Sequence, residues 1–191
     1  MTKLTIQERL RILRDKVRSG ELKQGGGLGN EVNYHIFDYD PSDELLVSKE
    51  VENIAKSLST IKVFNIYDII TEILKEKDYL EKSFELEKQK GSDHVNKAIM
   101  RALKTDSKDG LIIKKISKSI KKGDTVFLTG IGQSYQIIRA HTLLSNLQSV
   151  INDSDNPVIL FYPGSYDRQT LSLFNTFPAE NYYRAFKLVE R

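Results

Sequence analysis

The sequence has no cysteine, no tryptophan and only four prolines, and it has no apolar run of membrane-spanning length. The lack of cysteine excludes disulfides, thiolate metal sites and a cysteine nucleophile, and it fits a reducing compartment. A membrane-spanning helix needs about 20 consecutive apolar residues. The N-terminus, MTKLTIQERLRILRDK, is charged and lacks the apolar core of a secretory signal. We therefore expect a cytoplasmic protein with no membrane partner.

The apolar residues that are present follow the pattern of an α/β protein. Hydrophobic residues make up 39% of the 191 residues, enough for one core. The stretch PVILFY (157–162) is short and wholly apolar, which is typical of a strand buried on both faces of a parallel sheet. Strand patterns alternate with helical spacing, so we expect a mainly parallel sheet flanked by helices, Rossmann-like or P-loop-like but without a working phosphate motif. The predicted strands are 32–39, 61–67, 125–129, 157–162 and 182–189, and the predicted helices include 134–151 and a short one at 170–174.

Three segments are predicted along the chain. Residues 1–24 form an amphipathic helix that opens with a capping box at Thr5 and must pack on the domain, another copy or a partner. Residues 25–30 contain GGGLG, which lacks a following Lys-Ser/Thr and precedes a strand, so we interpret it as a flexible link. Residues 31–191 form a single α/β domain.

A glycine pair follows the predicted strand 125–129. Gly130 and Gly132 lie between a strand and a helix, where free backbone N–H groups attract anions. The stretch TGIGQSY has neither the lysine of a Walker loop nor the third glycine of a dinucleotide fingerprint. We favour a tight turn, with weak phosphate binding as the alternative.

Two further stretches are candidate ligand or partner surfaces. Arg139 and His141 follow the glycine turn and either edge the buried face or meet a partner. The stretch FYPGSYD ends a buried strand, where α/β proteins bind ligands, and the alternative is a Pro-Gly turn with Asp167 capping a helix. The candidate surface residues are Gly130, Gly132, Arg139, His141, Tyr162, Gly164, Tyr166 and Asp167.

No catalytic, cofactor-binding or metal-binding residues are predicted. The acidic cluster Asp38, Asp40, Asp43 and Glu44 could hold magnesium, but Asp40-Pro41 is also typical of a helix start, which we prefer. Asp68 is expected to cap a later helix. The three histidines are scattered without metal-ligand spacing.

Residues 97–122 are strongly basic. They carry nine basic and two acidic residues, a net charge of +7, so the rest of the chain carries −4 within the total of +3. Such a field could steer an anionic partner, although most charge runs are solvated faces. The candidate residues facing nucleic acid are Lys114, Lys115, Lys118, Lys121 and Lys122.

Several stretches, in order, resemble the BrxB family of bacterial BREX phage-defence systems. They are FDYDPSDELLV, FLTGIG with RAHTLLSNLQ, and FYPGSYD, LSLF and NYYRAFKL, from about residue 30 to the C-terminus. The resemblance implies a small cytoplasmic component that is not known as an enzyme and brings no catalytic residues or cofactor. It also implies association with PglZ, the alkaline-phosphatase-like component, and with other BREX components.

We therefore expect a non-enzymatic adaptor that binds the PglZ-like protein. The alternative is a degenerate nucleotide- or nucleic-acid-binding module within the same defence complex. Exposed aromatic residues would anchor a protein partner. The expected anchors are Tyr162, Tyr166, Tyr182 and Tyr183, with core packing as the alternative for each. The N-terminal helix, if it docks on the partner, should be removable without unfolding the domain.

Overall fold

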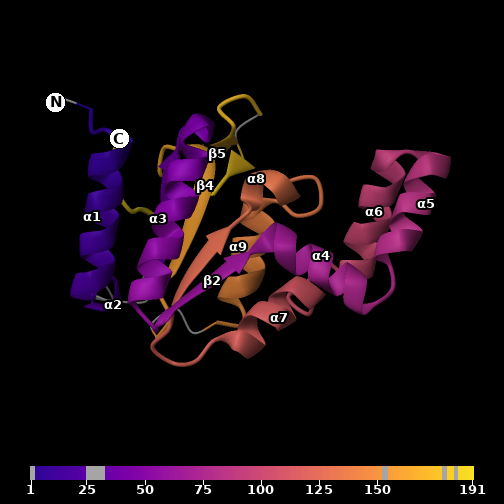
Figure 1. Cartoon of the computed structure of the whole chain (residues 1–191), viewed down its shortest axis with the longest axis horizontal. Helices are drawn as coiled ribbons and strands as arrows, with labels where there is room; N and C mark the ends of the chain where they lie inside the picture. The colour runs from indigo at the N-terminus through magenta and orange to yellow at the C-terminus, as the bar shows by residue number, and fades with distance from the viewer. Residues whose placement is uncertain (1–2, 25–32, 152–154, 178–179, 183–184) are drawn as a thin grey trace.

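A computed structural model describes residues 3–24, 33–151, 155–177, 180–182 and 185–191 (Figure 1). The predicted link 25–30 and Tyr183 lie outside the described residues. Within them, none of the helices is long and apolar enough to cross a bilayer. The helices are α1 (Ile6–Ser19), α2 (Glu21–Gln24), the 3₁₀ helix η1 (Pro41–Asp43), α3 (Glu44–Ser57), α4 (Ile66–Glu76), α5 (Leu80–Lys90), α6 (Ser92–Leu103), α7 (Leu111–Ser119), α8 (Ile131–Ser134) and α9 (Ala140–Gln148).

A parallel sheet forms the centre of the fold and confirms the predicted fold class. The strands run in the order β2-β3-β4-β1-β7 and all neighbours on this path are parallel. β5 and β6 extend β4 as an antiparallel ribbon. The strands are β1 (Tyr34–Tyr39), β2 (Ile61–Asn65), β3 (Thr125–Thr129), β4 (Val158–Tyr166), β5 (Thr170–Leu173), β6 (Glu180–Asn181) and β7 (Phe186–Lys187).

Helices cover both faces of the sheet, and alternate strand residues face the two layers. Phe127 and Phe161 belong to a core with α1 and α3, whereas Leu128 and Leu160 belong to a core with α4, α7 and α9. Figure 1 shows α1 and α3 on one side of the sheet and α4, α7 and α9 on the other. Burial on both faces explains why β3 and β4 are so apolar.

The N-terminal helix is part of this core. The predicted capping box is present, since Glu8 N donates to Thr5 Oγ1 at 3.3 Å and Thr5 N donates to Glu8 Oε2 at 2.8 Å. Leu13 is fully buried in the layer formed with α3, and Arg9 is buried too. Removal of residues 1–24 would expose this core layer, so we expect the deletion to destabilise the domain rather than to leave it folded.

Three predicted elements differ from the structure. Residues 170–174 are not helical: Leu171 and Leu173 are buried at a period of two, and β5 pairs with β4. The predicted helix 134–151 is interrupted between α8 and α9, where Ile138 N bonds to Ser134 O at 3.0 Å in a tight turn. Among the described residues of the predicted last strand, β7 (Phe186–Lys187) pairs with β1, and Leu188 N bonds to Ile36 O at 2.9 Å.

The side chain that begins α4 also differs from expectation. Asn65, not Asp68, is the N-cap, and its Oδ1 accepts hydrogen bonds from Tyr67 N at 3.0 Å and Asp68 N at 3.3 Å. The helix starts at Ile66, directly after β2, which is earlier than its apolar spacing indicates. Asp40 does cap η1, with Pro41 in the first turn, as expected.

Replacing Leu13 with alanine should lower the free energy of unfolding by about 2 to 5 kcal/mol, because the cavity lies in a fully buried site. Urea denaturation followed by circular dichroism measures the change. Leu45→Ala is the matched control, since Leu45 is 84% exposed and its loss should change stability by less than about 0.5 kcal/mol. Equal stability of the two variants would contradict the assignment of α1 to the core.

Candidate functional site

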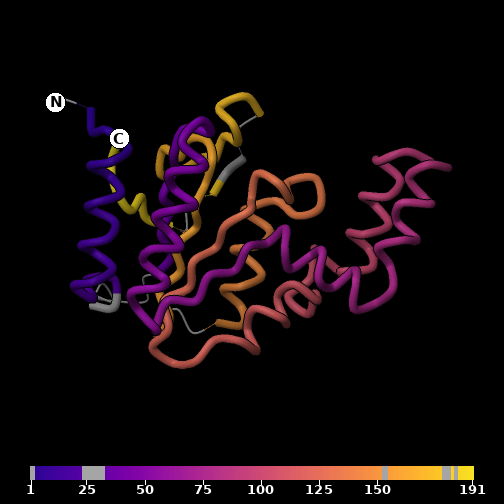
Figure 2. Tube along the Cα trace, viewed as in Figure 1, coloured from indigo at the N-terminus to yellow at the C-terminus, as the bar shows by residue number. Residues whose placement is uncertain are grey.

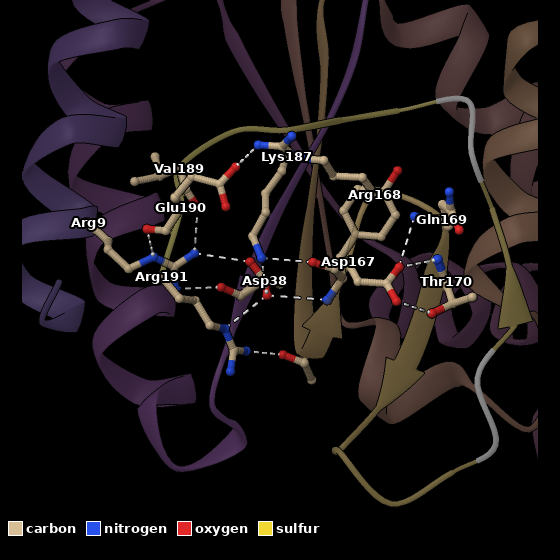
Figure 3. A network of polar contacts seen from close by, with 12 residues as sticks. Arg9, Asp38, Asp167, Arg168, Gln169, Thr170, Lys187, Val189, Glu190 and Arg191 are labelled. Carbon is tan, nitrogen blue, oxygen red and sulfur yellow. Dashed lines mark hydrogen bonds and ion pairs between the residues drawn. The ribbon is translucent and has the colours of Figure 1, made fainter. Parts of the chain in front are cut away.

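The carboxyl end of the parallel sheet is the usual place for a ligand in this fold class, and here it holds a buried carboxylate. Asp38, on β1, has no exposed surface. Its Oδ1 accepts a hydrogen bond from Arg9 Nη2 at 3.1 Å. Its Oδ2 lies 2.9 Å from Arg191 Nε and 3.4 Å from Lys187 Nζ (Figure 3). Three cations therefore converge on one carboxylate.

Backbone groups complete this network. Tyr166 N donates to Asp38 Oδ2 at 3.3 Å. Arg9 donates to the carbonyls of Asp38 at 2.7 Å, Val189 at 3.0 Å and Glu190 at 3.1 Å. Burial lowers the pKa of the Arg9 guanidinium, and the nearby carboxylate of Asp38 opposes that shift. The network thus joins α1, β1 and the C-terminal segment, and both carboxylate oxygens of Asp38 are engaged by groups of the chain itself.

The other members of the predicted acidic cluster serve the local structure. Asp40 Oδ1 accepts from Ser42 N at 3.0 Å and from Ser42 Oγ at 2.7 Å, which is the preferred capping role. Glu44 accepts from the buried Tyr39 hydroxyl at 2.7 Å. Among the described residues, no three histidine or acidic side chains are grouped closely enough to hold a metal ion.

The glycine turn after β3 is filled by side chains of the chain itself. Gly130 has φ +73°, a backbone conformation that favours glycine, and a Cβ there would lie 2.1 Å from Asn65 Oδ1. A Cβ on Gly132 would lie 2.8 Å from the Phe174 ring and 3.1 Å from Pro163 Cγ. The two glycines are therefore required for close packing at this turn.

Arg139 and His141 lie at the start of α9. Arg139 is the N-cap residue, and its guanidinium lies 5.5 Å from the centre of the Tyr135 ring. His141 is half-buried, with Nε2 3.1 Å from Thr142 Oγ1. Arg139 is exposed, whereas His141 is half-buried.

The predicted tyrosine anchors are mostly core residues, which corrects the sequence-based expectation. Tyr162, Tyr166 and Tyr182 are buried with at most 4% exposure. The Tyr166 hydroxyl donates to Ala185 O at 2.8 Å, and burial, followed by the charge of Asp167, raises the pKa of Tyr166 to about 12. These aromatic rings fill the space between the sheet and its covering layers, so they cannot anchor a partner.

The stretch FYPGSYD also has a different structure from the expected turn and helix. Pro163 and Gly164 lie within β4, and a Cβ on Gly164 would lie 2.2 Å from Ser172 O. Asp167 accepts from Gln169 N at 2.9 Å and Thr170 N at 2.6 Å. Asp167 therefore shapes the β4–β5 turn and caps no helix.

Several exposed apolar side chains lie on or beside a pair of helices that the sequence analysis did not single out. Helices α5 and α6, the helical arm (residues 80–103), extend from the body of the domain (Figures 1 and 2). α5 buries none of its residues. A groove of about 230 Å³ lies where the arm meets α4 and α8, and Tyr67 and Phe84 line it, each 47% exposed. The aromatic residue Phe84 in a helix rich in Glu and Lys was the available signal.

The predicted basic residues lie on and after α7. Lys115 is half-buried and pairs with Glu72 at 3.1 Å and Glu76 at 2.7 Å, whereas Lys122 pairs with Asp155 at 3.2 Å. Lys114, Lys118 and Lys121 are exposed.

The geometry defines an α/β domain in which the chain's own side chains fill the carboxyl ends of the parallel strands. The groove and the exposed cations described above lie on or beside helices. The family model described as "BREX protein BrxB" matches residues 62–188. A "BREX protein BrxB" of Bacillus cereus (strain H3081.97) is 38% identical over 191 residues, covering 97% of this chain and 98% of that protein. A "BREX protein BrxB" of Escherichia coli O9:H4 (strain HS) is 30% identical over 187 residues, covering 96% and 92%.

The chain belongs to the BrxB family, as its sequence motifs indicate, and this membership places it among the components of BREX systems. No solved structure gives a significant match.

Replacing Asp38 with asparagine should lower the free energy of unfolding by about 3 to 5 kcal/mol, because three cations lose their buried counter-charge. Adding Arg191→Gln to that variant should cost at least about 1 kcal/mol less than it costs in the original protein, since it removes a cation that is already unpaired. Urea denaturation measures both effects.

The control is Asp15→Asn, an exposed acid on α1, which should change stability by less than about 0.5 kcal/mol. Strict additivity of Asp38→Asn and Arg191→Gln would show that the network does not couple these residues.

Proposed function

We propose that the chain is a non-enzymatic adaptor of a BREX anti-phage defence system and that it binds the PglZ-like component in the bacterial cytoplasm. Two nearly full-length relatives that carry the name BREX protein BrxB support a role within such a system. The resemblance of the sequence to that family supports the choice of the PglZ-like protein as partner. The chain then works by holding proteins together.

The packing at the carboxyl ends of the parallel strands supports a role without catalysis. An active site in this fold class needs unsatisfied polar groups aimed at a substrate at the strand ends. Both carboxylate oxygens of Asp38 instead contact Arg9, Arg191 and neighbouring groups. The glycine turn is packed against Asn65 and Phe174. Among the residues that the structure describes, these polar groups and glycines therefore serve the packing of the fold, which supports a role without catalysis.

The single observation that carries the adaptor role is the groove beside the helical arm. Protein interfaces are built around aromatic anchors in apolar depressions with a polar rim. Tyr67 and Phe84 supply exposed rings, Ile99 and Ile137 supply apolar lining, and Glu87 lies among the polar residues of the groove. The arm also carries the exposed Met100. We assign this groove to the PglZ-like partner.

Co-expression with the PglZ-like protein encoded in the same defence system, followed by size-exclusion chromatography with light scattering, tests the adaptor role. A co-eluting complex of defined mass is expected. Phe84→Ser should weaken that complex by at least about tenfold, since a truncated anchor residue typically costs 2 kcal/mol or more. Its 47% exposure means that the fold should survive the substitution.

Leu45→Ser is the matched control, because Leu45 is an exposed apolar residue on α3, away from the arm. Unchanged affinity of Phe84→Ser would exclude the groove as the docking surface. Separate elution of the two unmodified proteins at micromolar concentration and low salt would overturn the adaptor proposal itself.

A further inference from the structure

Helices α6 and α7 each carry a row of cations opposite the face that they bury. On α6, Val95 and Leu103 are buried, whereas Lys97 and Arg101 are exposed one turn apart. Since an α-helix repeats every 3.6 residues, these cations lie on the side opposite the buried pair. Lys104, at the C-cap of α6, continues the row.

Helix α7 repeats this arrangement. Ile112 and Ile116 are buried, and Lys114 and Lys118 are exposed at the same four-residue spacing. Lys121 follows just after the helix and is exposed as well. Both helices therefore direct cations outward every turn, about 6 Å apart along the axis.

The connection between the two helices is anchored to the domain. In Figure 1, α7 follows the C-terminal end of α6 across a short connection. Thr105 is buried in that connection, and its carbonyl accepts a hydrogen bond from Asn146 Nδ2 of α9 at 3.2 Å. Lys108 lies in the connection between the two helices and is exposed. A groove of about 300 Å³ lined by Lys97, Arg101 and Met100, among others, lies at the α6 end.

Most of these cations lack an acidic partner. Lys115 and Lys122 form the ion pairs described above, and the acidic residues of the segment are Asp106 and Asp109. The remaining seven cations are exposed and form no ion pair with the part of the chain that the structure describes. This basic surface consists of Lys97, Arg101, Lys104, Lys108, Lys114, Lys118 and Lys121.

The residue types of the basic surface favour one class of anionic partner over the others. Lysine is depleted at protein interfaces, which depend on apolar and aromatic anchors. The one large apolar side chain exposed between residues 92 and 122 is Met100. Single-stranded nucleic acid is held by base stacking on aromatic rings, and this segment contains no Phe, Tyr or Trp. Rows of cations without aromatics instead match the phosphate backbone of a duplex.

We infer that the basic surface of α6 and α7 binds the phosphate backbone of duplex nucleic acid without reading its sequence. The binding energy comes from counterion release, so affinity falls steeply as salt rises. The unpaired cations are placed for phosphates because their helices are anchored through the opposite, apolar faces. Duplex binding by the isolated chain does not require the PglZ-like protein, so its failure would leave the adaptor proposal standing.

Fluorescence anisotropy with a duplex of about 30 base pairs and arbitrary sequence, at several salt concentrations from about 50 mM, tests this inference. The unmodified protein should bind with micromolar affinity at low salt, and a second duplex of unrelated sequence should bind equally well. The triple variant Lys114→Gln/Lys118→Gln/Lys121→Gln should weaken binding by about tenfold or more and should reduce the slope of log affinity against log salt by up to about 3. The same result is expected for Lys97→Gln/Arg101→Gln/Lys104→Gln.

The matched control is Lys49→Gln/Lys56→Gln/Lys62→Gln, which removes the same net charge from α3 and β2. Equal weakening by this control would overturn the basic surface as the binding site, as would the absence of duplex binding at low salt. Displacement of the duplex by polyglutamate at equal charge concentration would overturn the nucleic-acid assignment in favour of an acidic protein.

Discussion

The fold depends on one buried carboxylate. Asp38 lies in the strand next to β4 and neutralises cations contributed by residues at both ends of the sequence, Arg9 before it and Lys187 and Arg191 after it. A buried carboxylate is costly unless it is paired and hydrogen-bonded, and Asp38 meets both conditions. Its loss is expected to cost about 3 to 5 kcal/mol, a large part of the 5 to 15 kcal/mol by which domains are stable. The first helix and the last strand are therefore held by the same charge.

This arrangement also fills the carboxyl ends of the strands with side chains of the chain itself. Parallel sheets bind ligands beyond the carboxyl ends of their strands, where polar groups and helix starts converge. Here Asp38 holds the Arg9 side chain that bonds to the C-terminal segment, at the carboxyl ends of the strands. Asn65 and Phe174 pack against the glycine turn. The outline of a phosphate loop is present because Gly130 and Gly132 permit that packing. The groove and the basic surface described above lie on or beside the helices instead.

Periodicity predicted most of the architecture, and its failures have physical causes. Apolar runs identified the central strands because burial on both faces leaves few polar residues in them. The helical prediction for 170–174 failed because strand pairing with β4 and the left-handed residues Phe174 and Asn175 set that conformation. The Asp38 network could not be predicted from local patterns, since Arg9 and Asp38 are 29 residues apart and meet only after folding. The exposed Phe84 is an aromatic residue in a helix rich in Glu and Lys, and this composition is the local signal for the groove.

Helix α6 connects the two proposed surfaces. Ile99 lines the apolar groove, whereas Lys97 and Arg101 lie on the opposite side of the same helix. Because these sets are separated by about half a turn, a protein seated in the groove does not need to cover the cations. Phosphate attraction acts over a Debye length of about 8 Å at physiological salt, so the cations need only face a duplex and do not need to be enclosed. One short helical arm can therefore hold a protein on one face while the other face remains open to an anionic partner.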